Sequence, residues 1–128
     1  MIKIYTDGGS RRNPGKSACA FIVVQNNNII KQQSKYLGIG TNNEAEYNAI
    51  ILALTMINEK DIEIISDSEL AIKQINAEYK IKKPHLQKLK DKIDDLVKNR
   101  NIKFSNSHRE NEFISKADFL VNQELDKH

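Results

Sequence analysis

The N-terminal segment Ile2-Lys-Ile-Tyr-Thr-Asp, residues 2–7, alternates apolar and polar side chains, and it begins the series of elements that decides the fold. This alternation predicts a β-strand, which we expect to stop at Gly8-Gly9, where the backbone can turn sharply. The turn signal Asn13-Pro-Gly follows, and the apolar run from Ser17 to Gln25 predicts a second strand. A third strand is expected from Ile29 to Leu37, which completes a meander of three strands.

Beyond Gly38 and Gly40, where we expect the third strand to break, helical and strand-like segments alternate. The predicted elements are a helix from Thr41 to about Asn58, a strand over 61–66, a helix over 68–77, a helix that begins at Pro84, a strand over 102–105 and a last helix from about Phe113. The order β-β-β-α-β-α-α-β-α predicts an α/β fold, with a five-stranded mixed sheet and helices on its faces. The length of 128 residues fits a single domain, 1–128.

The bulk composition is that of a soluble globular protein, with 29% charged and 39% hydrophobic residues. No apolar run is long enough to span a bilayer, and the N-terminus lacks the layout of a signal peptide. We therefore expect a cytoplasmic protein without a membrane partner. The single cysteine, Cys19, lies in an apolar run and cannot form an internal disulfide, so a buried structural thiol is expected.

Positive charge is concentrated in one part of a weakly basic chain. The net charge is +3, but residues 78–103 contain nine Lys or Arg side chains against four Asp or Glu. Such a segment is compatible with contact to a phosphate backbone. A solvated helix face is the alternative, and composition by itself favours it.

Four carboxylates lie where folding does not require one: Asp7, Glu46, Asp67 and Asp118. Each ends a strand-like apolar run or lies on an otherwise apolar helix stripe. They are far apart in the chain, so only the fold can bring them together, and a cluster of four needs compensating cations. An all-carboxylate site suits a hard divalent cation such as Mg²⁺ or Mn²⁺.

The two helical carboxylates interrupt apolar stripes. Glu46 precedes Ile50, Ala53 and Ile57 by four, seven and eleven residues, so these side chains share one helix face. Stabilisation by the helix dipole is the alternative role for Glu46. Asp118 shares the stripe of the last helix, and its alternative is a position at the helix edge that reaches water.

The other two carboxylates follow strands. Asp7 ends the first strand, and an ordinary turn at a strand end is its alternative explanation. Asp67 directly follows the apolar segment 62–65, and ligands of open α/β sheets gather beyond the carboxyl ends of strands. Its alternative role is to cap the helix that begins at Ser68.

Four motifs together resemble the type 1 ribonuclease H family, in the family's order and over nearly the whole chain. They are Tyr5-Thr-Asp-Gly-Gly-Ser with Asn13-Pro-Gly, Thr41-Asn-Asn-Glu-Ala-Glu-Tyr, Ser66-Asp-Ser, and His108 followed by Asp118 in Lys116-Ala-Asp-Phe-Leu. The resemblance implies the ribonuclease H-like fold, in which the first strand is central and an antiparallel meander forms one edge.

The resemblance also implies an activity. Members of this family cleave the RNA strand of RNA–DNA hybrids endonucleolytically and leave 5′-phosphate and 3′-hydroxyl ends. Carried over to this chain, Asp7, Glu46, Asp67 and Asp118 are the catalytic ligands of two Mg²⁺ ions, with Mn²⁺ as a substitute. His108 corresponds to a histidine assigned to proton transfer or product release.

The same resemblance assigns contacts to the hybrid. Asn13, Asn42 and Asn43 match residues that contact the minor groove, where an amide can read a 2′-hydroxyl; turn and cap chemistry is their alternative. Thr41 matches a pocket for a DNA phosphate, although an Arg that some members carry two residues earlier is Ile39 in this chain.

The chain departs from some members of the family in what would hold the DNA strand. It has no Trp, and only a short link joins its two middle helices, so it resembles a short form without the basic, Trp-containing protrusion. We also expect no hybrid-binding domain before Met1, no obligate protein partner, and a monomer. Lys80, Lys82 and Lys83 provide a smaller electrostatic substitute, which predicts weaker and salt-sensitive hybrid binding.

Two other functions compete with a hybrid nuclease. One is a catalytically silent nucleic-acid-binding module on the same fold, although such a module has no need of all four carboxylates. The other is a different phosphoryl-transfer protein of the broader fold, integrase-like or ATP-binding, but the chain contains no P-loop.

Overall fold

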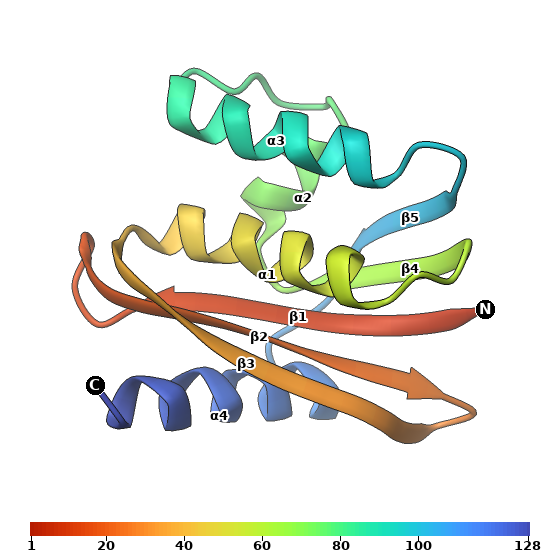
Figure 1. Cartoon of the computed structure of the whole chain (residues 1–128), viewed down its shortest axis with the longest axis horizontal. Helices are drawn as coiled ribbons and strands as arrows, with labels where there is room; N and C mark the ends of the chain where they lie inside the picture. Colours follow the sequence, from red (N-terminus) through yellow and green to blue (C-terminus); the bar gives the residue numbers. More distant parts are fainter.

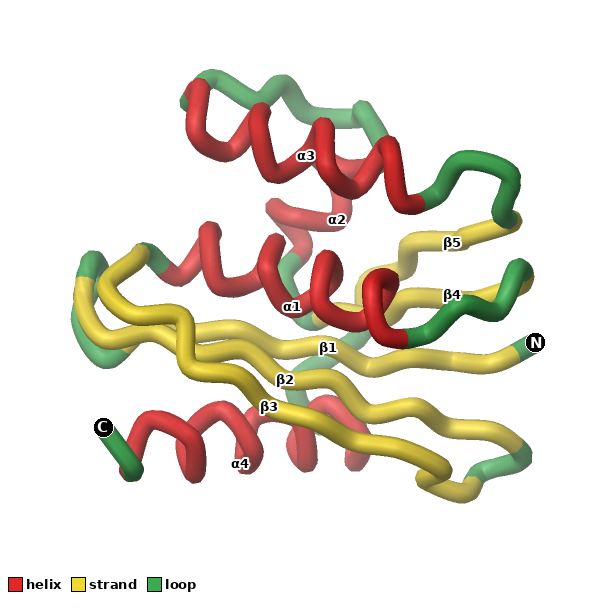
Figure 2. Tube along the Cα trace, viewed as in Figure 1, coloured by secondary structure: helices red, strands yellow, loops and turns green.

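The structure is a computed structural model that describes all residues from 1 to 128, and it contains one five-stranded sheet and four helices (Figures 1 and 2). In chain order, the elements are β1 (Ile2–Ser10), β2 (Gly15–Gln25), β3 (Asn28–Gly40), α1 (Asn42–Met56), β4 (Asp61–Ser66), α2 (Glu69–Ile75), α3 (Pro84–Leu96), β5 (Asn101–Asn106) and α4 (Glu112–Asp126). The predicted order of elements is confirmed.

The sheet is mixed, with the first strand at its centre. Its strand order is β3-β2-β1-β4-β5. The strands β1, β2 and β3 pair antiparallel as a meander, whereas β1, β4 and β5 pair parallel. The carboxyl ends of β1 and β4 therefore meet at the same edge of the sheet, which is where ligands bind in open α/β sheets.

Helices cover both faces of the sheet, as predicted. Figure 1 shows α1 lying along one face with α3 stacked over it, and α4 on the opposite face. Successive side chains of a strand point to opposite faces, so β1 supplies both cores. Ile4 packs with the α1 side, in a cluster that includes Phe21 and Tyr47, and Tyr5 packs against Phe113 on the α4 side.

The expectation that glycines end the first and third strands is wrong. Strand β1 continues through Gly8 and Gly9, which pair with Cys19 and Ala18. Gly8 serves close packing against α1 rather than a turn. Strand β3 continues to Gly40. Gly38, at a φ of 81°, accommodates a register shift between β2 and β3, so the chain bulges there without leaving the sheet.

The local signals for helix starts are confirmed. Thr41 caps α1, and its hydroxyl and backbone N–H form a reciprocal capping box with Glu44. Pro84 lies in the first turn of α3, where its missing N–H costs nothing. Cys19 is fully buried, and burial raises the pKa of its thiol to about 12. None of the four helices combines the length and apolar character needed to cross a membrane.

Candidate active site

Three of the four predicted carboxylates come together at the carboxyl edge of the sheet. Asp7 belongs to β1, Glu46 to the second turn of α1, and Asp67 directly follows β4. Each offers one carboxylate oxygen, and these three oxygens lie within 4.8 Å of one another. Residues that are up to sixty positions apart in the chain thus form one acidic group.

Strand register and one glycine explain this convergence. In the parallel pair of β1 and β4, Thr6 is the partner of Ser66, so the next residue of each strand is a carboxylate. A Cβ atom on Gly8 would lie 2.2 Å from the backbone carbonyl of Ala45, so only glycine allows α1 to approach β1 this closely. The close approach places Glu46 beside Asp7.

The fourth carboxylate, Asp118, lies at the open side of this group. The apolar stripe of α4 is buried, but Asp118 is exposed at its edge, so the edge position that the sequence left open is the one observed. Asp118 nevertheless lines a cavity of about 380 Å³ together with Asp7 and Glu46. Its negative charge contributes to raising the pKa of Asp7.

The site carries more negative charge than its surroundings support. Asp7 is 6% exposed, and burial, followed by the charges of Asp67 and Asp118, raises its pKa to about 8. Glu46 is 9% exposed, and burial, followed by the charges of Asp7 and Asp67, raises its pKa well above its usual value. The Gly8 backbone hydrogen bond lowers both pKa values but does not reverse these effects. A cation is therefore needed for all the carboxylates to ionise.

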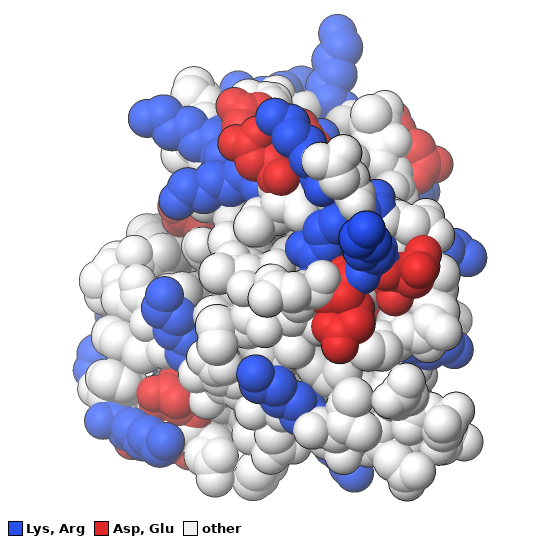
Figure 3. Space-filling model, turned by 45° about the vertical axis from the view of Figure 1, so that its right-hand side comes forward, with Lys and Arg blue, Asp and Glu red and all other residues white.

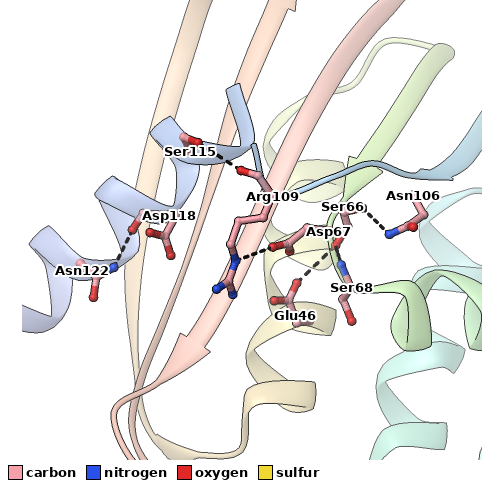
Figure 4. A network of polar contacts seen from close by, with 9 residues as sticks. All are labelled: Glu46, Ser66, Asp67, Ser68, Asn106, Arg109, Ser115, Asp118 and Asn122. Carbon is pink, nitrogen blue, oxygen red and sulfur yellow. Dashed lines mark hydrogen bonds and ion pairs between the residues drawn. The ribbon is translucent and has the colours of Figure 1, made fainter. Parts of the chain in front are cut away.

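Hydrogen bonds around Ser66 hold Glu46 and the end of β4 in place (Figure 4). The Ser66 hydroxyl donates to Glu46 Oε2 at 3.3 Å and accepts the Ser68 backbone N–H at 3.1 Å. The Ser66 carbonyl accepts from the Asn106 side chain at 3.0 Å, which ties the end of β5 to the end of β4. Ser66 thus links α1, β4 and β5 at the site.

The alternative role of Asp67 as a helix cap is wrong. Ser68 is the cap of α2, and its hydroxyl accepts the Ala71 N–H at 3.3 Å. The Asp67 carboxylate, 12% exposed, instead forms an ion pair with Arg109, whose Nε lies 3.4 Å from Asp67 Oδ2. No role for Arg109 was predicted from the sequence. The signal for it was available, because a cation directly follows His108 in the loop that leads to the helix of Asp118.

His108 does not line the carboxylate cavity. It is exposed in the loop between β5 and α4, and its carbonyl accepts the Asn111 N–H at 3.1 Å. Asn111 in turn caps α4. The side chain that this loop directs into the cavity is that of Arg109, so the assignment of proton transfer to His108 stays a prediction.

The residues expected to contact a hybrid lie at or beside the start of α1, and three of the four also form hydrogen bonds within the protein. Asn42 and Asn43 line the cavity. Asn42 Oδ1 accepts the Ser10 N–H at 2.8 Å, and Asn13 Oδ1 accepts the Asn42 N–H at 3.1 Å, so turn and cap chemistry applies to both. Thr41 caps α1, and its hydroxyl also contacts Glu44.

The donor set fits a metal-dependent active site. All three clustered ligands are carboxylates, and oxygen donors of this kind suit hard divalent cations. The raised pKa values of Asp7 and Glu46 show that the site is short of positive charge, and the cavity beside them provides access. A divalent cation would supply that charge and allow both buried carboxylates to ionise.

Comparisons with known proteins agree with the fold and identify a family. The family model for RNase H matches residues 1–124. Ribonuclease HI of Halobacterium salinarum is 32% identical over 129 residues, which cover 98% of this chain and 64% of the relative. A bifunctional protein of Mycobacterium tuberculosis is 31% identical over 93 residues, which cover 69% of this chain and 26% of that protein. The chain thus spans less than two thirds of the length of these relatives.

The solved structures show the same architecture. LC11-RNase H1, solved in complex with an RNA/DNA hybrid, superposes with a TM-score of 0.92 at 36% identity, over 99% of this chain and 98% of the other. The protein came from compost by a metagenomic approach. The fold, the carboxylate group and the family match all agree, and the chain belongs to the ribonuclease H family.

Proposed function

We propose that this protein is an endoribonuclease that hydrolyses the RNA strand of RNA–DNA hybrids and leaves 5′-phosphate and 3′-hydroxyl ends. The observation that carries the proposal is the group formed by Asp7, Glu46 and Asp67, whose oxygens lie within 4.8 Å of one another in a member of the ribonuclease H family. A structural relative at 36% identity was solved with a hybrid, which supports the same class of substrate.

Asp7, Glu46 and Asp67 would hold two Mg²⁺ ions, or Mn²⁺ in their place, with Asp118 as the fourth ligand. Bound there, the ions would supply Lewis-acid chemistry, which would activate a water and stabilise the leaving oxygen of an in-line displacement. The protein's part is to fix the ligands. Ser66 orients Glu46, and Gly8 keeps α1 close to β1. Because Asp7 and Glu46 must lose protons to bind a cation, metal binding releases protons and tightens as the pH rises towards 8.

Asn42 and Asn43 would contact the substrate, and this assignment is supported by their position in the lining of the cavity next to the carboxylates. An amide side chain both donates and accepts hydrogen bonds, so it can read a 2′-hydroxyl or a base edge in the shallow minor groove of a hybrid. The bond from Ser10 to Asn42 holds this amide in a fixed orientation.

A cleavage assay tests the proposal. A hybrid with a labelled RNA strand is incubated with Mg²⁺ or Mn²⁺ and with the wild type, Asp7→Asn or Asp95→Asn. We expect the wild type and Asp95→Asn to cleave the RNA strand, because Asp95 lies on the exposed surface of α3. Asp7→Asn should lose cleavage by at least about 100-fold, because a ligand of the metal site is removed.

The same assay separates the competing function. A silent nucleic-acid-binding module would retain the hybrid in a gel-shift measurement and leave the RNA strand intact with either metal. Binding without cleavage by the wild type would therefore contradict the nuclease and favour the module.

A further inference from the structure

Arg109 is the only cation that contacts the acidic group. Its Nε lies 3.4 Å from Asp67 Oδ2, and its side chain lines the same cavity as Asp7 and Asp118. Figure 4 shows the guanidinium reaching between Asp118 on one side and Asp67 with Glu46 on the other. The pKa of Arg109 is raised by its hydrogen bond to Asp67, by the charge of Asp67 and by that of Asp118, so the side chain faces several carboxylates.

The backbone of Arg109 is anchored, whereas its side chain is held by a single partner. The Ser115 hydroxyl donates to the Arg109 carbonyl at 3.1 Å, and the Asn111 N–H donates to the carbonyl of the preceding residue at 3.1 Å. The side chain is 82% exposed and bonds only to Asp67. An exposed ion pair of this length contributes little free energy, so the guanidinium can leave Asp67 without disturbing the loop.

Arg109 and a divalent cation require the same carboxylate. Asp67 contributes its oxygen both to the ion pair and to the group of three oxygens that fits a metal. Once dications neutralise Asp67, the attraction that holds the guanidinium there is lost. A phosphate brought to the carboxylates would then lie within reach of Arg109, and the planar guanidinium pairs with phosphate as readily as with carboxylate.

We propose that Arg109 is a displaceable counter-cation, which neutralises Asp67 in the metal-free protein, gives way to the divalent cation, and then binds a phosphate of the substrate strand. This inference rests on the proposed nuclease function. It assigns Arg109 two anionic partners in succession, and it predicts that Arg109 opposes metal binding and favours substrate binding.

Calorimetric titration of Mg²⁺ and Mn²⁺ into the metal-free protein, without nucleic acid, tests the first half. We expect Arg109→Gln to bind the metal about two- to fivefold more tightly than the wild type, because an exposed ion pair no longer competes. Arg109→Lys, which keeps the charge, should stay close to the wild type. Lys98→Gln removes one positive charge at the far end of α3 and controls for net charge. Weaker metal binding by Arg109→Gln would overturn the proposal, because Arg109 would then position Asp67 as a ligand.

Steady-state cleavage at saturating Mg²⁺ tests the second half. Arg109→Gln should raise KM for the hybrid by roughly three- to tenfold, with partial rescue by Arg109→Lys, because a charged contact to substrate is lost. An unchanged KM would overturn the contact with phosphate. If the wild type itself binds no divalent cation in the calorimeter, the nuclease function fails; if the wild type binds metal and Arg109→Gln binds it no more tightly, only the role of Arg109 fails.

Discussion

At the scale of single residues, Gly8 determines whether the carboxylates can meet. A Cβ at this position would lie 2.2 Å from the carbonyl of Ala45 and 2.6 Å from the backbone nitrogen of Glu46, distances that real structures do not show. Gly8→Ala must therefore push the start of α1 away from β1, and with it the carboxylate of Glu46. Because backbone rather than a flexible side chain is in the way, relaxation will be costly.

For Gly8→Ala we expect a loss of metal affinity of tenfold or more, together with a fall in stability of about 1–3 kcal/mol from overpacking. Metal calorimetry and thermal unfolding measure the two effects. Gly9→Ala is the matched control, because a Cβ on Gly9 meets no atom closer than 3.9 Å. Equal behaviour of the two variants would show that close approach at Gly8 is not what positions Glu46.

The raised pKa of Asp7 gives a second prediction at this scale. Folding raises this pKa from 3.8 to about 8, so the folded metal-free protein binds a proton that the unfolded chain has released. Stability should therefore fall as the pH rises from about 4 to about 8, since unfolding then releases protons. Asp7→Asn removes the charge, so in a chelator its melting temperature should exceed that of the wild type increasingly with pH.

At pH 8 the melting temperature of Asp7→Asn in chelator should exceed that of the wild type by several degrees. Each kcal/mol of stability corresponds to roughly 3–5 °C in a domain of this size. Added Mg²⁺ should raise the melting temperature of the wild type more than that of Asp7→Asn, because only the wild type keeps the full ligand set. A variant less stable than the wild type in chelator at pH 8 would contradict the electrostatic account of the site.

The sequence predicted the places of the site residues with unequal success. The stripe of α1 identified Glu46 as a carboxylate facing the core, and the residue is buried. Asp118 also lies on an apolar stripe but is exposed, because a stripe indicates a helix face and not how far neighbouring elements cover it. Arg109 could not be found from periodicity, since it lies in a loop and only the fold brings it to Asp67.

At the scale of elements, Arg100 joins the ends of two helices. Its guanidinium donates to the carbonyls of Leu54 and Ile57 at the end of α1, of Glu59 just beyond, and of Leu96 at the end of α3. Backbone carbonyls at a helix end lack partners within the helix, so this side chain satisfies several of them together.

Arg100→Ala should destabilise the protein by roughly 2–3 kcal/mol, because hydrogen bonds from a charged donor to half-buried carbonyls are lost. Denaturant unfolding measures this loss. Arg12→Ala, at an exposed position of the turn between β1 and β2, should cost less than about 0.5 kcal/mol. Metal affinity should be unchanged in the folded Arg100→Ala protein, and a changed affinity would show that the helix ends communicate with the site.

Local sequence patterns predicted the types and order of the elements, but they did not predict the structural roles of the glycines. Caps and prolines act within a few residues, so Thr41 and Pro84 indicated the starts of α1 and α3 correctly. Gly8 and Gly38 were wrongly predicted to end strands. A glycine that permits a close approach or a bulge cannot be distinguished in the sequence from one that permits a turn.

At the scale of the whole molecule, the proposed nuclease function requires positive charge to hold a hybrid. Figure 3 shows Lys and Arg side chains gathered over the end of the molecule that carries α3, with acidic side chains among them. Lys80, Lys82 and Lys83, in the link between α2 and α3, line a shallow cavity that shares Asn43 with the active-site cavity. These lysines therefore lie on the same side of the molecule as the active-site cavity.

Hybrid affinity should fall steeply with salt, because each phosphate contact adds roughly 0.9 to the slope of log affinity against log salt. Replacing Lys80, Lys82 and Lys83 together by Ala should lower that slope by about 2–3. A triple replacement of Lys88, Lys92 and Lys98, on α3 and just after it, has the same charge change and should lower the slope less. Filter binding across a salt series measures both, and a flat response of the wild type would contradict electrostatic gripping.

The central position of β1 also constrains how the protein folds during synthesis. Strand β1 completes its parallel pairing only with β4, which begins at Asp61. Its second face is covered only by α4, which begins at Glu112. Pairing between distant segments is slow, because much chain must be ordered before the contacts form. During synthesis on the ribosome, the carboxylates of β1 and α1 emerge long before the helix that carries Asp118. A nascent chain therefore exposes an unfinished site, and nuclease activity should appear abruptly, only when α4 has docked.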